Sequence, residues 1–149
     1  MTSLVFPDIN VWLALSSSIH VHHLEAKRWF ASLTDDEELV FCRFTQLGLL
    51  RLLTTGTVMG DDVRTQRQAW RIYDTFLADG GARFMHEPRT LEESFRKLSR
   101  SVSASPKEWA DSYLTSFAIE TGATLVTFDK ALAARTSGSI LLKPKTSSI

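Results

Sequence analysis

SPKEWADSYLTSFAIETGATLVTFDK, residues 105–130, predicts a helix, a tight turn and a buried strand in succession. Ser105 and Glu108 are expected to form an S-x-x-E capping box at the start of the helix. Gly122 supplies the left-handed conformation that ends many helices, and residues 124–128 are short and β-branched, as in a buried strand. The helix carries one apolar stripe at i, i+3, i+4 spacing, formed by Ala110, Tyr113, Leu114, Phe117 and Ala118.

Two carboxylates belong to this unit, and the N-terminus adds a third. Asp111 is expected in the second turn of the helix, and Asp129 directly follows the strand. The apolar run 4–6 predicts another short strand, followed by Pro7 and Asp8. Ligands of parallel sheets bind beyond the carboxyl ends of the strands, so neighbouring strands would bring Asp8 and Asp129 together. Asp111 would reach them from the helix.

A single aspartate at such a position is most simply an N-cap or a turn residue. For Asp8 alone, just before the helical pattern of residues 10–15, the N-cap interpretation is favoured. Three acids in matching positions at one sheet edge shift the balance towards a metal site.

The composition indicates a globular protein without a dominant charge. At 149 residues and 44% hydrophobic content, residues 1–149 are expected to form one domain. Lys plus Arg and Asp plus Glu number 17 each, so an RNA partner would require local basic patches. Cys42 is the single cysteine, which excludes an intrachain disulfide. With no signal peptide or long apolar run in the sequence, we expect a soluble, cytoplasmic protein.

Strands and helices are expected to alternate along the rest of the chain. Further strands are predicted at 39–42, 82–85 and 140–142, and helices at 10–15, 20–33, 43–54, 62–77, from Thr90, and 130–135. This alternation predicts an α/β fold, a three-layer α/β/α sandwich with a mostly parallel central sheet. Leucines at helical spacing are expected to pack in the helix 43–54, namely Leu47, Leu50 and Leu53. In the helix 62–77 the residues expected to pack are Val63, Trp70, Tyr73 and Leu77.

Two polar clusters have simpler structural interpretations than functional ones. The histidines His20, His22 and His23 match no zinc spacing and are interpreted as surface or packing residues outside the site. A row of arginines on the helix 62–77 is more often a solvated face than a phosphate contact. Its members are Arg64, Arg67 and Arg71.

Four segments, in order and spacing, resemble the PIN-domain nucleases and specifically the VapC toxins of bacterial toxin–antitoxin modules. They are LVFPDINVWLAL, FCRFTQLGLLRLLT, EWADSYLTSFA and LVTFDKAL, and the resemblance covers nearly the whole chain. It implies a PIN-like fold and a metal-dependent endoribonuclease that uses Mg²⁺ or Mn²⁺. It also implies an RNA substrate, for which a structured RNA such as tRNA is plausible, a VapB-type antitoxin and a homodimer. By matching position, Asp8, Asp111 and Asp129 are the implied catalytic and metal-binding residues.

The sequence departs from this family at one place. The family usually carries a glutamate on the helix after the second strand, where this chain reads Thr45-Gln46-Leu47-Gly48. Glu37 and Glu38 precede that strand and are expected at its opposite end. The site would therefore hold three carboxylates, with Gln46 offering a neutral oxygen, and the number of metal ions stays open.

The residue types suit a hard divalent cation. Mg²⁺ takes oxygen ligands and keeps several waters, and it lowers the pKa of a bound water that can attack a phosphate. We expect Asp8 and Asp111 to be the principal ligands, with Asp129 binding through water or orienting the nucleophile. Asn10, Gln46 and Thr127 are candidates to hydrogen-bond these carboxylates.

Two other functions remain open. A phosphatase of the haloacid-dehalogenase type also places an aspartate after its first strand, but it requires a second aspartate two residues later, where this chain has Asn10. A catalytically silent binding module with the PIN fold is the other alternative, and Gln46 is the one feature that favours it.

Overall fold

Residues 2–143, which the computed structural model describes, contain five strands that form one sheet in the order β3-β2-β1-β4-β5. Every neighbouring pair is parallel, so all the carboxyl ends lie at the same edge of the sheet. The strands are β1 (Ser3–Pro7), β2 (Glu37–Phe41), β3 (Arg83–Phe84), β4 (Thr124–Thr127) and β5 (Ile140–Leu141).

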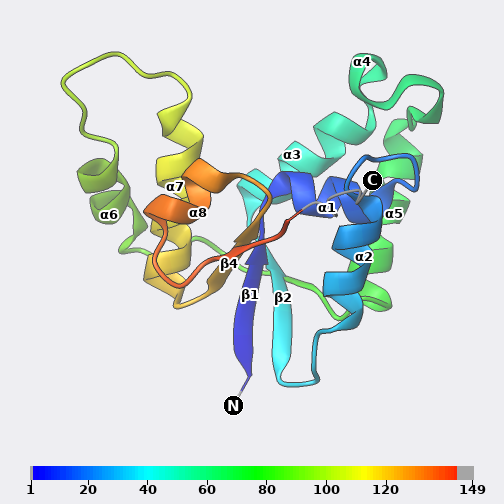
Figure 1. Cartoon of the computed structure of the whole chain (residues 1–149), viewed down its shortest axis with the longest axis horizontal. Helices are drawn as coiled ribbons and strands as arrows, with labels where there is room; N and C mark the ends of the chain where they lie inside the picture. Colours follow the sequence, from blue (N-terminus) through cyan, green and yellow to red (C-terminus); the bar gives the residue numbers. More distant parts are fainter. Residues whose placement is uncertain (1, 144–149) are drawn as a thin grey trace, which may run out of the picture.

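Helices cover both faces of this sheet. Figure 1 shows α6, α7 and α8 on the left of the sheet and α1, α2, α3 and α5 on the right, which confirms the predicted α/β sandwich. Their bounds are α1 (Ile9–Ser16), α2 (His23–Ala31), α3 (Arg43–Leu53), α4 (Gly56–Met59), the 3₁₀ helix η1 (Gly60–Asp62), α5 (Gln66–Ala78), α6 (Leu91–Leu98), α7 (Glu108–Thr121) and α8 (Lys130–Arg135).

Each face of the sheet has its own apolar core. On the α1–α3–α5 side, the fully buried Trp12 stacks on Phe41 with ring centroids 3.9 Å apart. On the α7–α8 side, Phe6 packs on Phe117 at 4.6 Å. Burying aromatic side chains of this size makes a large contribution to stability, and it fixes the helices relative to the strand ends.

Helix α3 lies directly against the start of α1. A Cβ atom added at Gly48 would stand 2.2 Å from Cδ1 of Ile9, so only glycine allows this approach without a shift of Ile9. Because Ile9 follows Asp8, the contact places the first turn of α1 against the second turn of α3.

The predicted start of α7 is wrong, whereas its predicted end is confirmed. The helix begins at Glu108, and Lys107 at its N-cap position makes no side-chain cap. Ser105 instead accepts a hydrogen bond from the Glu108 N–H through its backbone carbonyl, at 3.1 Å. Residues 105–108 therefore form a turn before the regular helix, and Asp111 lies in the first helical turn. Gly122 ends the helix with a φ of 71°.

The predicted apolar faces of α3 and α5 are partly wrong. Leu47 is 61% exposed and Trp70 is 48% exposed, and Val63 is exposed as well. The buried face of α3 is centred on Leu49, which points about 200° away from Leu47 around the helix. Helix α5 begins at Gln66 rather than 62, behind a capping box of Thr65 and Gln68. No helix within residues 2–143 has the length and apolarity to cross a bilayer.

Candidate metal centre

Asp8 lies at the junction of β1, β4 and α1. Its backbone N–H donates to the Val126 carbonyl at 2.9 Å, which anchors it beside β4. Its Oδ1 caps α1 by accepting from the Ile9 N–H at 2.6 Å, and its Oδ2 accepts from the Thr127 hydroxyl at 3.0 Å. The side chain is only 9% exposed. The N-cap interpretation of Asp8 therefore holds, together with a second contact from the neighbouring strand.

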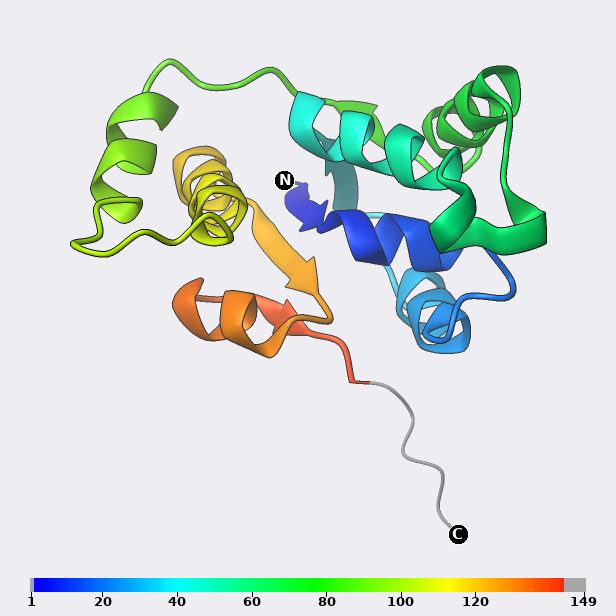
Figure 2. The ribbon, with the colours of Figure 1, turned by 90° about the horizontal axis from the view of Figure 1, so that it is seen from above.

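Asp129 follows β4 and caps α8. Its Oδ1 accepts from the backbone N–H groups of Ala131 and Leu132, at 2.9 and 3.2 Å. Its own N–H donates to the Thr127 hydroxyl at 3.0 Å. Thr127 is fully buried, and its hydroxyl thus links the backbone of Asp129 to the carboxylate of Asp8. Figure 2 looks onto this edge, where β4 leads into α8 on one side and α1 runs off on the other.

The three aspartates are electrostatically coupled. Burial raises the pKa of Asp8, and the negative charges of Asp111 and Asp129 raise it further, against the hydrogen bonds from Thr127 and Ile9. Burial also raises the pKa of Asp111, and Asp129 adds to this rise. Asp8, Asp111 and Asp129 thus lie on three different elements, and the charges of Asp111 and Asp129 reach Asp8.

Within residues 2–143, no three side chains of His, Cys, Asp or Glu stand close enough together to enclose a metal ion. A preformed cage is thus not part of the described structure. The chemistry of the three aspartates still fits a hard divalent cation, because every donor is a carboxylate oxygen. Like charges that raise one another's pKa are also stabilised by a cation between them.

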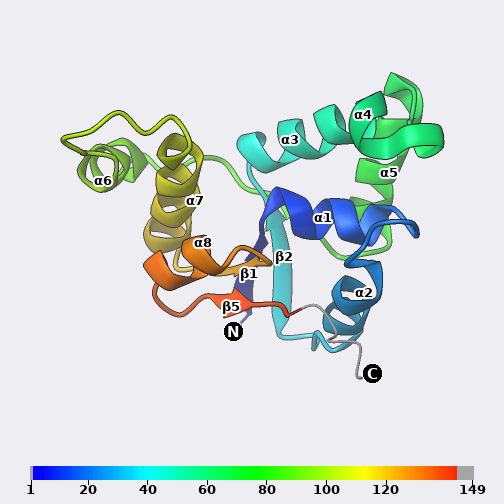
Figure 3. The ribbon, with the colours of Figure 1, turned by 45° about the horizontal axis from the view of Figure 1, so that its top comes forward.

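A polar seam holds α8, which Asp129 begins, against α7, which carries Asp111. The Arg135 side chain donates to the Ser112 hydroxyl at 2.9 Å and to the Leu98 carbonyl at the end of α6 at 3.4 Å. Buried hydroxyls of Thr115 and Thr136 meet 2.8 Å apart. Figure 3 shows α7 and α8 side by side. Sequence reasoning missed this seam because it sought only apolar contacts between helices.

The histidines pack, as predicted, but two of them border the site. The His22 ring stacks on Phe128 at 4.5 Å, and His20 Nδ1 accepts from the His22 N–H at 3.0 Å. Both line a hollow of about 410 Å³ together with the exposed Asn10 and with Asp129. Among the described residues, Asn10 makes no hydrogen bond to a carboxylate. The segment 17–22 folds back over the end of β4, and no local spacing could indicate this.

Within residues 2–143, Gln46 does not hydrogen-bond the carboxylates, for which it was a candidate. It is 7% exposed, its Oε1 accepts from Arg43 Nη1 at 2.5 Å, and its side chain lies beside the Tyr73 hydroxyl, where it partly offsets the rise that burial causes in the pKa of Tyr73. The described contacts of Gln46 thus join it to Arg43 and Tyr73 rather than to the aspartates. Glu38 lies at the opposite edge of the sheet, as predicted, where it pairs with Arg83.

The all-parallel sheet defines an α/β protein, and its aspartates lie at the carboxyl edge, where ligands of such sheets usually bind. The family model described as PIN domain matches residues 5–137. Ribonuclease VapC41 of Mycobacterium tuberculosis is 42% identical over 132 residues, which cover 83% of this chain and 88% of the relative. Ribonuclease VapC38 of the same species is 28% identical over 124 residues, 82% of each chain. The chain therefore belongs to the PIN-domain family, among its VapC ribonucleases.

Solved structures share the fold. M. tuberculosis VapC20, described as a sarcin–ricin loop cleaving toxin, has a TM-score of 0.66 at 20% identity and covers 95% of this chain and 100% of its own. VapBC2 from Rickettsia felis, bound to a promoter DNA fragment, has a TM-score of 0.67 at 14% identity, with 95% and 99% covered. At these identities the likeness shows the fold alone. The haloacid-dehalogenase alternative is wrong, since the family is PIN.

Proposed function

We propose that Asp8, Asp111 and Asp129 are the catalytic and metal-binding residues of this VapC ribonuclease. The observation that carries the proposal is their coupling at the carboxyl edge of the sheet, where burial and mutual repulsion raise the pKa of both Asp8 and Asp111. Such perturbed, clustered acids are typical of functional sites. Mg²⁺ or Mn²⁺ is the proposed cofactor, since both prefer oxygen donors.

Each of these aspartates has its own proposed role in RNA hydrolysis. Asp8 and Asp111 would hold the cation, and Asp129 would bind it through water or orient the attacking water. A bound divalent cation supplies a water of lowered pKa and offsets negative charge at the phosphate. Thr127 holds the Asp8 carboxylate in one orientation by its hydrogen bond, and the seam at Arg135 keeps Asp111 and Asp129 on facing helices.

The proposed substrate is RNA, with a structured RNA such as tRNA as the class to test first. Named ribonuclease relatives and a structural neighbour described as cleaving the sarcin–ricin loop support this choice. A VapB-type antitoxin is the proposed partner, because VapBC and toxin–antitoxin complexes are among the structural neighbours. We propose that residues 1–149 act as a single PIN domain, which the one sheet formed by the strands of residues 2–143 supports. We also propose that the protein acts in the cytoplasm.

Cleavage of RNA in defined metal concentrations tests the function. The purified protein is incubated with total RNA and with tRNA, in EDTA and in Mg²⁺ or Mn²⁺, and the fragments are sequenced. We expect discrete cuts only with a divalent cation. Undiminished cleavage in EDTA would show that no metal is used. The absence of cuts in every RNA, with the antitoxin removed, would favour the silent binding module.

We also propose a homodimer formed through an apolar groove between α3 and α5. The groove has a volume of about 680 Å³ and is lined by Phe44, Leu47, Leu50 and Trp70 among others. Leu47 and Trp70, which are 61% and 48% exposed, lie in the same groove, and a contiguous exposed apolar patch of this kind typically marks a protein–protein interface. A second copy is the occupant we favour, because a homodimer would bury this apolar groove even when no antitoxin is bound.

Leu47→Asp is expected to convert the dimer to a monomer, because a carboxylate would be buried unpaired at the interface. Light scattering after gel filtration measures the mass. Leu24→Asp is the matched control, since Leu24 is 65% exposed on α2 and should leave the mass unchanged. If the parent protein is a monomer and Leu47→Asp instead loses antitoxin binding, the groove belongs to the antitoxin.

A further inference from the structure

We infer that Arg43 binds a backbone phosphate of the RNA beside the phosphate that is cut, and that Gln46 and Phe84 hold its guanidinium ready for this contact. The inference rests on the proposed function, because it assigns a substrate-binding residue to the same sheet edge. Arg43 is exposed and lies at the first position of α3.

The register of the sheet places Arg43 beside the aspartates. Val5 of β1 pairs with Leu39 of β2, and continuing this parallel register sets Asp8 level with Cys42. Arg43 is the residue after Cys42, so it lies one residue further along the chain than the position level with Asp8. Neighbouring strands lie about 4.8 Å apart, so the two backbones are separated by one strand spacing at the same edge. An RNA strand that presents one phosphate to Asp8 passes within reach of Arg43.

Two contacts fix the guanidinium of Arg43 before any ligand binds. Its Cζ lies 4.5 Å from the centre of the Phe84 ring, and its Nη1 donates to Gln46 Oε1 at 2.5 Å. Gln46 is itself buried beside Tyr73, whose ring packs on Phe41 at 4.8 Å. A guanidinium has five N–H donors, so the others remain for a ligand. A held guanidinium loses less rotamer entropy when it binds a phosphate.

The positive charge of Arg43 is not neutralised within the described fold. Among residues 2–143 the ion pairs involve other cations, namely Arg28, Arg64, Arg83, Arg96 and Lys97. The group that Arg43 contacts is the neutral amide of Gln46, at a site where a glutamate would form a salt bridge. Arginine binds phosphate through parallel N–H···O bonds, so an uncompensated guanidinium at this edge favours an RNA phosphate. The amide of Gln46 thus orients the arginine and leaves its charge free.

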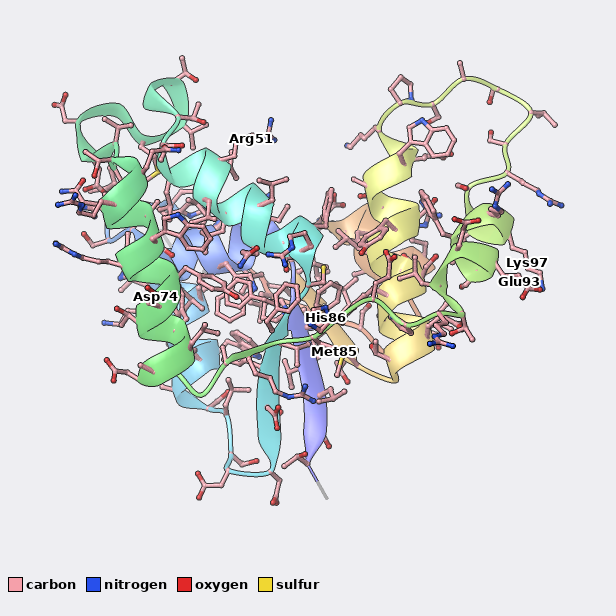
Figure 4. All side chains as sticks on the ribbon, turned by 180° about the vertical axis from the view of Figure 1, so that it is seen from behind. Arg51, Asp74, Met85, His86, Glu93 and Lys97 are labelled. Atoms are coloured by element: carbon pink, nitrogen blue, oxygen red, sulfur yellow. The ribbon has the colours of Figure 1, made fainter. Side chains whose placement is uncertain are left out.

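The surroundings of Arg43 suit an extended ligand. His86 follows β3 at the same edge, with its ring 5.0 Å from that of Phe84. Figure 4 shows His86 between the first turn of α3 and α7, whereas Arg51, further along α3, points away from the molecule. Arg51 is exposed and, among the ion pairs of residues 2–143, it has no partner. It therefore provides a matched control for the loss of one positive charge from α3.

The test measures RNA affinity without cleavage. Every protein carries Asp8→Asn, and binding of a fluorescent RNA hairpin is followed by anisotropy in EDTA over a range of salt concentrations. Arg43→Gln is expected to weaken binding about tenfold, the loss of one charge-assisted contact. Its slope of log affinity against log salt should fall by about 0.7 to 0.9, as for one lost phosphate contact. Arg51→Gln should match the Asp8→Asn parent.

Gln46→Glu provides the second arm of the test. The new carboxylate would pair with Arg43, so RNA affinity and salt slope should fall as in Arg43→Gln, while Mn²⁺ affinity in the otherwise unmodified protein stays unchanged. Arg43→Lys, which keeps the charge, should retain the salt slope even if its packing on Phe84 is weaker.

Equal RNA affinities of Arg43→Gln and Arg51→Gln would overturn the inference, as would tighter binding by Gln46→Glu. If the unmodified protein cuts RNA with metal while Arg43→Gln binds normally, only the inference fails. If the unmodified protein neither cuts nor binds any RNA, the proposed function fails and the role of Arg43 with it.

Discussion

Asp8→Asn is expected to abolish RNA cleavage and to leave the protein at least as stable as the parent in metal-free buffer. Asp8 is buried beside two other acids, and its raised pKa shows that its negative charge is unfavourable there without a cation. Asparagine removes the charge, and its side-chain oxygen can still accept from the Ile9 N–H and cap α1. The cation loses a proposed principal ligand, so the activity should fall below detection.

The difference in stability between Asp8→Asn and the parent protein should depend on pH. The folded-state pKa of Asp8 lies above its ordinary value of 3.8, so between these two pKa values the folded state binds more protons than the unfolded state. Stability is then greatest in acid and falls as the pH rises through 3.8 towards the folded-state pKa. The advantage of Asp8→Asn should therefore grow as the pH rises from about 4 and become constant above the folded-state pKa of Asp8.

Thermal unfolding in EDTA across this pH range measures the effect. Asp35→Asn, an exposed acid at the opposite edge of the sheet, is the control and should follow the parent. Added Mn²⁺ should raise the melting temperature of the parent but not that of Asp8→Asn, since the ion stabilises only the form that binds it. Normal cleavage by Asp8→Asn would remove Asp8 from the site.

Thr127→Val is expected to lower the cleavage rate by about 10–100-fold, the usual effect of losing a group that orients a metal ligand. Valine keeps the shape but removes the hydroxyl that donates to Asp8 Oδ2 and accepts from the Asp129 N–H. Both groups then lack a partner, which should also reduce the free energy of unfolding by about 1–3 kcal/mol. The pKa of Asp8 should rise further.

Cleavage rates over a range of Mg²⁺ concentrations, with urea unfolding of the same proteins, test the role of Thr127. Thr127→Ser keeps the hydroxyl and should retain most of the activity. If Thr127→Val needs no more metal than the parent and cuts at the same rate, Thr127 is a packing residue alone.

The strand ends at which the aspartates lie were predictable because their signals are local. β1 and β4 are short apolar runs that stop directly before Asp8 and Asp129, and parallel pairing brings such ends to one edge. Helix α8 has the predicted bounds because Asp129, which caps it, is adjacent in sequence. Asp111 required a longer step, from the helical phase of α7, and it lies in the first turn of that helix rather than in the predicted second turn.

Features that depend on contacts between distant segments were not predictable. Leu47 matched the apolar pattern of α3, but the close approach of Gly48 to Ile9 turns the Leu49 face inward. The burial of Gln46 depends on α5, which supplies Tyr73 some 27 positions later. The polar seam between α7 and α8 was not predictable either. In the sequence, Ser112 and Thr115 resemble exposed polar residues, and only the fold brings Arg135 and Thr136 to them.

Mn²⁺ binding at neutral pH, followed by the electron paramagnetic resonance signal of the free ion, tests most directly whether the three aspartates form the metal centre. The parent protein should bind Mn²⁺, and Asp8→Asn, Asp111→Asn and Asp129→Asn should each weaken its affinity, with the largest losses at Asp8 and Asp111. Asp35→Asn and Gln46→Glu should bind Mn²⁺ as the parent does. Unchanged Mn²⁺ affinity in both Asp8→Asn and Asp111→Asn would contradict a metal centre at this edge of the sheet.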